Sequence, residues 1–115
     1  MWGTATLGLR IRLAIDTAAT ETLLRPSVLE RLGYDVADAE QITVIQSALG
    51  RERGYLMRVS RLHALGFTAY DDVVHAHELP GQYDIDGLLG LRFLDRFDYL
   101  IRSMRCEIDV QLASP

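Results

Sequence analysis

The chain contains no lysine and no asparagine, and it has a single cysteine among its 115 residues. That residue, Cys106, excludes an intrachain disulfide and a zinc site built from cysteines. No run of 18 apolar residues occurs, and the first residues lack the pattern of a signal peptide. We therefore expect a cytoplasmic protein with no membrane segment; the alternative is an N-terminal anchor that lies outside this sequence.

An excess of positive charge is also lacking. The twelve basic residues, all arginine, stand against sixteen acidic ones, and the formal net charge is −4 at pH 7. Binding to phosphates requires a basic excess, so we do not expect nucleic acid as a partner. Hydrophobic residues make up 49% of the chain and charged residues 24%, which is typical of a globular protein. With no low-complexity segment or linker, residues 1–115 are expected to form a single domain.

The pattern of apolar residues predicts a mainly β fold with one or two short helices. Residues 4–15 alternate between apolar and polar side chains, which is typical of a half-buried strand. The other expected strands span residues 21–24, 41–49, 55–65, 66–79, 99–101 and 106–112. One helix begins near Pro26 and ends before Gly33, and a second carries the apolar residues Leu91, Phe93, Leu94 and Phe97. These elements predict a small closed, barrel-like sheet.

A long β-hairpin is expected in the middle of the chain. Its two strands are separated by the polar segment Gly50-Arg51-Glu52-Arg53-Gly54. Glycines on either side of charged residues predict that this segment is the solvated tip of the hairpin.

The most informative segment is Asp16-Thr17-Ala18-Ala19-Thr20, which follows the apolar run Leu13-Ala14-Ile15. A strand that ends at Ile15 would deliver the Asp16 carboxylate to a tight loop. By itself the pentapeptide also fits an aspartate that only caps a turn. A second signal lies far downstream, where Asp86-Gly87-Leu88-Leu89-Gly90 forms a glycine-bounded apolar turn that leads into the second helix.

An Asp-Thr-small-small turn followed much later by a Leu-Leu-Gly turn resembles the single-domain aspartic proteases of the retropepsin type. The resemblance covers nearly the whole chain and implies a small closed β-barrel with a hairpin flap. It makes Asp16 the catalytic residue and Thr17 the residue that locks two such loops across a dimer axis. The residues that it implies as loop support are Ala18, Leu88, Leu89 and Gly90. Those that it implies at the substrate are Ala19, Thr20, Gly50, Arg51, Glu52, Arg53 and Gly54.

The same resemblance implies an aspartic endopeptidase that needs no cofactor and cuts extended polypeptides. Two carboxyl groups within hydrogen-bond distance share one proton, because both cannot ionise together. One then acts as a base on a water molecule while the other donates to the carbonyl oxygen. Since the chain has one such loop, the second carboxyl group must come from another copy, in a homodimer.

Two departures from the family pattern favour a second hypothesis, a catalytically weak or inactive module that binds peptides or dimerises. Ala18 replaces the usual glycine of the loop, which is costly only if its φ is positive. The hairpin tip carries Arg51-Glu52-Arg53 instead of a glycine-rich sequence. A third hypothesis, a metal-dependent hydrolase, would use His75 and His77, but their spacing is not diagnostic and we expect no metal site.

The residue after the loop predicts the pH of optimal activity. Ala19 resembles the retroviral pattern, whereas the pepsin pattern has a hydroxyl at this position. Without that extra hydrogen bond to the carboxylates, the pair is easier to protonate. We expect maximal peptide cleavage in mildly acidic solution, and a maximum below about pH 3 would contradict the prediction.

Overall fold

The computed structural model describes residues 8–47, 50–102 and 107–112 of the chain. The elements are β1 Leu13–Ile15, β2 Leu23–Leu24, α1 Pro26–Arg31, the 3-10 helix η1 Val36–Asp38, β3 Gln41–Ser47, β4 Gly50–Ala64, β5 Phe67–Ala76, β6 Gly87–Leu89, α2 Leu91–Leu94, β7 Phe97–Arg102 and β8 Glu107–Leu112. Strands predominate, so the mainly β prediction with two short α-helices is confirmed. None of the described helices has the length and apolar character needed to cross a bilayer.

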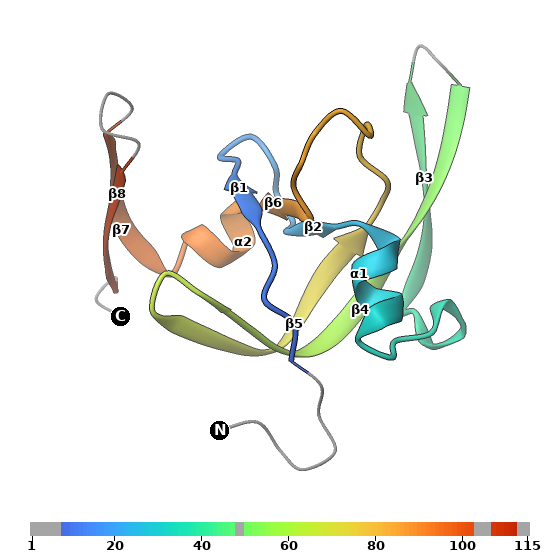
Figure 1. Ribbon diagram of the computed structural model, residues 1–115, viewed down its shortest axis with the longest axis horizontal. Coiled ribbons are helices and arrows are strands. Elements are labelled where there is room, and N and C mark those ends of the chain that lie inside the picture. The colour runs from blue at the N-terminus through green and yellow to red at the C-terminus, as the bar shows by residue number, and fades with distance from the viewer. Residues whose placement is uncertain (1–7, 48–49, 103–106, 113–115) are drawn as a thin grey trace.

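Six strands form one sheet in the order β1-β6-β2-β5-β4-β3, and β7 pairs with β8 in a separate sheet. Figure 1 shows the long β4–β5 hairpin along the lower part of the molecule and the β7–β8 pair standing apart at the left. Within the described residues β1 and β3 are the two edges of the larger sheet, and no pairing joins them. The sheet is therefore open, and the closed barrel expected from the sequence is not confirmed.

The segment Gly50 to Gly54 is the first part of β4, so the prediction that it forms the hairpin tip is wrong. Its residues pair in register with β3, from Gly50 opposite Ser47 to Gly54 opposite Thr43. A Cβ on Gly54 would lie 2.6 Å from the carbonyl oxygen of Ala76 in β5. The glycine that suggested a turn therefore marks a close approach of strands. Residues 48–49, which join β3 to β4, lie outside the described residues.

Among the described residues of the strand expected over 4–15, only Leu13–Ile15 form a strand, β1. Residues 1–7 lie outside the described part of the chain, and residues 8–12 have no regular secondary structure. Leu9 and Ile11 nevertheless pack against the core. The backbone N–H of Arg12 donates to the Asp86 carboxylate at 2.7 Å, and the Asp86 N–H donates to the Arg12 carbonyl at 2.8 Å. The apolar alternation thus reflects packing without a ladder of strand hydrogen bonds.

Two clusters of buried side chains form the core. Helix α1 contributes Val28 and Leu29 to the first cluster, and it begins at Pro26 as the sequence predicted. The second cluster surrounds Phe93 of α2, whose side chain is fully buried. Phe97, expected on the second helix, begins β7 instead, and its ring packs 5.8 Å from that of Phe93. Leu24 of the first cluster and Leu89 of the second lie on the same face of the six-stranded sheet, because each follows a member of the cross-strand pair Leu23–Leu88.

The opposite face of the sheet is partly exposed. Strand register places Leu88 of β6 and His75 of β5 on either side of Leu23 in β2. We call this row the open face, and from β1 to β4 its members are Ala14, Leu88, Leu23, His75 and Leu56. Side chains alternate along a strand, so Asp16, two residues after Ala14, lies on the side of the open face.

Candidate active site

Asp16 occupies a tight turn that is stabilised by hydrogen bonds within the turn and by one hydrogen bond to β6. Its backbone N–H donates to the carbonyl of Leu89 in β6 at 3.0 Å. One carboxylate oxygen, Oδ1, accepts a hydrogen bond from the N–H of Ala18 at 2.9 Å. The Ala19 N–H donates to the Asp16 carbonyl at 3.2 Å, which closes the turn. The carboxylate is therefore fixed in direction and only partly buried.

The first turn of α2 holds the far side of the same loop. The N–H groups of Leu91 and Arg92 donate to the carbonyls of Ala19 and Thr20 at 2.8 and 2.9 Å. N–H groups in the first turn of a helix have no partner within the helix, so they are available for such contacts. The loop of residues 16–20 is thus joined to β6 at its start and to α2 at its end.

Gly90 permits this close contact because it has no side chain. A Cβ at this position would lie 2.3 Å from the Glu21 carbonyl oxygen and 2.9 Å from the Thr22 backbone nitrogen. The Gly90 N–H also donates to the buried hydroxyl of Thr22 at 3.2 Å. Leu88 and Leu89 complete the support, since Leu88 lies on the open face and Leu89 is buried in the core.

An ion pair that the sequence analysis missed joins the two segments at the surface. Nη2 of Arg92 donates to Oε1 of Glu21 at 2.9 Å, and Nε of the same guanidinium lies 2.7 Å from Oε2. These residues are 71 positions apart, and no local pattern in a single sequence links them. The opposite charges add an electrostatic attraction to the contact between loop and helix.

The departure at Ala18 causes no backbone strain, because its φ is not positive. Ala18 and Thr17 are both exposed at the top of the turn, as is Thr20, whereas Ala19 is partly buried. The objection raised by the missing glycine therefore does not apply to the backbone of this loop.

The charged segment of β4 lies away from the Asp16 turn. Figure 1 shows the β3–β4 hairpin and the loop after β1 as separate projections from the same side of the molecule. Arg51, Glu52 and Arg53 are exposed, and Glu52 lies 3.1 Å from Nε2 of His77. Nδ1 of His77 lies 2.8 Å from the Glu78 carbonyl oxygen.

The neighbouring histidine has a different environment. Nε2 of His75 lies 2.7 Å from the Thr43 hydroxyl. Burial, with a smaller effect of His77, lowers the pKa of His75 below the usual histidine value. In the described part of the chain, no group of three or more His, Cys, Asp or Glu side chains is arranged to hold a metal ion.

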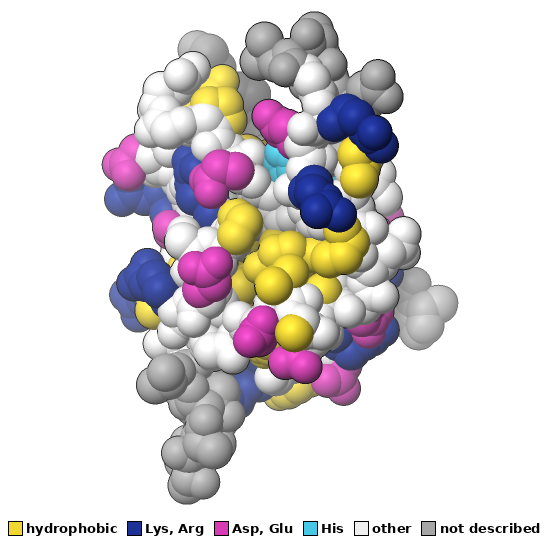
Figure 2. Space-filling model, turned by 90° about the vertical axis from the view of Figure 1, so that its right-hand side faces the viewer, with side chains coloured by type: hydrophobic (Ala, Val, Ile, Leu, Met, Phe, Trp, Pro, Cys, Tyr) yellow, Lys and Arg dark blue, Asp and Glu magenta, His cyan; other side chains and the backbone are white. Residues whose placement is uncertain are grey.

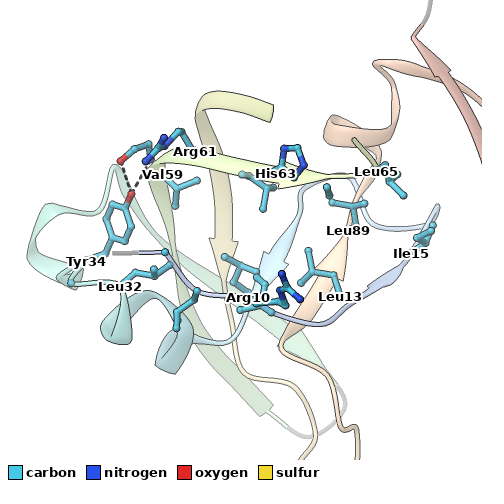
Figure 3. A pocket seen from close by; sticks show the side chains of 18 residues that line it. Arg10, Leu13, Ile15, Leu32, Tyr34, Val59, Arg61, His63, Leu65 and Leu89 are labelled. Atoms are coloured by element: carbon cyan, nitrogen blue, oxygen red, sulfur yellow. Dashed lines mark hydrogen bonds between the residues drawn. The ribbon is translucent and has the colours of Figure 1, made fainter. Parts of the chain in front are cut away.

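A cavity of about 800 Å³ lies on the core side of the sheet. Figure 3 shows it between the segment before β1 and the C-terminal part of β4, with Tyr34 at one end, hydrogen-bonded to Ser60. Leu13, Ile15 and Leu89 line it. Because these side chains point to the face opposite the open face, the cavity is separate from the Asp16 carboxylate.

The chain matches a family model described as "Aspartyl protease" over residues 4–93. This range includes the Asp16 turn, the β3–β4 and β4–β5 hairpins and the Leu88-Leu89-Gly90 support. Among solved structures, a retropepsin-like aspartic protease from Rickettsia conorii is similar, with a TM-score of 0.68 and 21% identity. The alignment covers 90% of this chain and 82% of the other. At this identity the similarity concerns the fold. No curated protein matches the chain.

The contact at Gly90 predicts a large effect of one methyl group. We expect Gly90→Ala to lower the free energy of unfolding by about 1–3 kcal/mol or more, because backbone atoms must move apart. Gly81→Ala is the matched control, since a Cβ there meets nothing within 4 Å. Urea unfolding measures both variants, and equal midpoints would show that the close approach is not needed.

The environment of His75 predicts how stability depends on pH. Its pKa is lower in the folded chain than the value of about 6.5 expected when unfolded. As the pH falls through that value, the unfolded chain takes up a proton that the folded chain does not, so stability decreases. We expect His75→Gln to lose less unfolding free energy than the unsubstituted chain between pH 7.5 and pH 5.5. An identical loss in both proteins would refute this role of His75.

Proposed function

The chain belongs to the aspartyl protease family, and we propose that it is an aspartic endopeptidase that hydrolyses peptide bonds in extended polypeptides. The observation that carries the proposal is the Asp16 turn, in which β6 and α2 hold a partly exposed carboxylate in one direction. Peptide hydrolysis without a metal requires a base to activate water and an acid to polarise the carbonyl. One carboxyl group can fill only one of these roles at a time.

We place the second carboxyl group on another copy of the chain, as Asp16 of a homodimer. The two groups would share one proton and titrate as a coupled unit. The carboxylate that is ionised would take a proton from the attacking water, and its protonated partner would donate to the carbonyl oxygen. Thr17 is exposed beside Asp16, a position from which its hydroxyl could join the two loops at the twofold axis.

An extended peptide would lie along the open face. Leu23 and Leu88 supply apolar contacts there, since both are partly exposed. Ala19 and Thr20 would border the peptide near the Asp16 turn. The β3–β4 hairpin, with residues 50–54, would act as a flap that closes over the substrate and excludes water.

A peptide-binding module without turnover is the second candidate. The observation that favours it is the exposed apolar surface of β3, where Ile42 and Val44 are about half exposed. Figure 2 shows the side of the molecule on which β3 lies, with hydrophobic side chains gathered at its centre and charged ones around them. An extended peptide could add to such a sheet edge through backbone hydrogen bonds.

The substitution Asp16→Asn separates the two candidates. We expect cleavage of a peptide library to fall by a factor on the order of 10³ or more, because an amide cannot act as the base. Asp38→Asn, which changes an exposed aspartate in η1, is the control and should cleave normally. Cleavage retained by Asp16→Asn would overturn the proposal. Peptide binding without cleavage by the unsubstituted chain would favour the binding module.

Mixing the same variant with the unsubstituted chain tests the dimer. If subunits exchange freely, an equal mixture contains roughly a quarter of fully unsubstituted dimers. We expect activity to fall to that fraction rather than to one half. A fall to one half, or a monomer by light scattering at high concentration, would count against a shared active site.

A further inference from the structure

The segment 77–86 joins β5 to β6 without regular secondary structure. Figure 1 shows it as a tall loop on the same side of the molecule as the Asp16 turn and the β3–β4 hairpin. Backbone carbonyls in such a loop need hydrogen-bond donors or water. In this loop most of the donors come from one side chain.

That side chain is Arg25, which follows β2 directly and is only 15% exposed. Its guanidinium donates to four carbonyl oxygens and to the carboxylate of Glu78. The carbonyls are those of Ile85 at 2.9 Å, Leu79 at 2.7 Å, Pro80 at 3.1 Å and Tyr83 at 2.9 Å. An arginine has five N–H donors, and these contacts use all of them.

The backbone of the same residue fixes the end of the loop. The Arg25 N–H donates to the Asp86 carbonyl at 2.9 Å. The carboxylate of Asp86 also accepts a hydrogen bond from the Arg12 N–H, and the Asp86 N–H donates to the Arg12 carbonyl. From there the chain enters β6, whose Leu89 carbonyl accepts the N–H of Asp16. Arg25 thus connects the shape of the loop to the strand that supports the Asp16 turn.

We propose that Arg25 is a positioning residue, whose guanidinium shapes the 77–86 loop into one wall of the groove that holds the peptide. This inference rests on the proposed function, because the peptide is placed beside the Asp16 turn. Arg25 would act through the loop and not on the reacting atoms. Its loss should therefore weaken substrate binding more than it slows the chemical step.

Lysine cannot replace this side chain. A lysine keeps the positive charge near Glu78 but has its three donors on a single nitrogen. It therefore cannot reach all of the carbonyls that surround the planar guanidinium of Arg25. Arg12→Lys is the matched control, because Arg12 is largely exposed and its side chain contacts the same loop only at Asp84, at 3.5 Å.

Steady-state kinetics on a peptide that the unsubstituted enzyme cuts provides the first test. For Arg25→Lys we expect KM to rise about tenfold or more while kcat changes less than about threefold. Arg12→Lys should match the unsubstituted enzyme in both constants. An unchanged KM for Arg25→Lys, or a loss confined to kcat, would overturn the proposal.

Hydrogen exchange provides a second readout that does not need activity. We expect the hydrogen-bonded amides of Leu79, Tyr83 and Asp86 to exchange at least about tenfold faster in Arg25→Lys, while those in the β4–β5 hairpin stay unchanged. Unchanged exchange in the loop would overturn the role of Arg25 whatever the kinetics. If the unsubstituted chain cuts no peptide, the proposed function fails, and exchange then decides alone whether Arg25 shapes the loop.

Discussion

The close approach of the Asp16 loop to the segment from β6 to α2 is the contact on which the candidate site depends. Three kinds of contact join these segments. The Asp16 N–H donates to the Leu89 carbonyl, N–H groups of α2 donate to carbonyls of the loop, and the backbone of Glu21 packs against Gly90. None of them involves the carboxylate itself. Backbone packing between segments that are far apart in the sequence therefore places the turn, and within the turn the Ala18 N–H on Oδ1 fixes the direction of the carboxylate.

The central part of this arrangement could be predicted from the sequence because its signals are local. Asp16 follows a short apolar run, and Leu88-Leu89-Gly90 is a glycine-bounded apolar turn that opens a helix. The end of a strand, a glycine without space for a side chain and the start of a helix can each be recognised from the types of a few consecutive residues. For that reason the sequence predicts both segments and the starts of both short helices where the structure has them, whereas the second helix ends at Leu94, before Phe97.

Features that depend on distant partners could not be predicted in this way. The pair of Glu21 with Arg92 and the five contacts of Arg25 link residues more than 50 positions apart. Local signals were also ambiguous where one residue type serves two purposes. Gly54 was interpreted as part of a turn, but it allows β5 to come close to β4. Apolar alternation in residues 8–12 was interpreted as a strand, but those residues pack without strand pairing.

The pairing of β4 also determines where the molecule bends most easily. From Tyr55 onward β4 is paired with β5, whereas residues 50–54 are paired with β3 alone. A ribbon held by one ladder of hydrogen bonds resists twisting less than a strand held on both sides. Thermal motion of the described residues should therefore concentrate in residues 50–54 and their partners in β3, and these residues would lose conformational entropy when a ligand holds them in place.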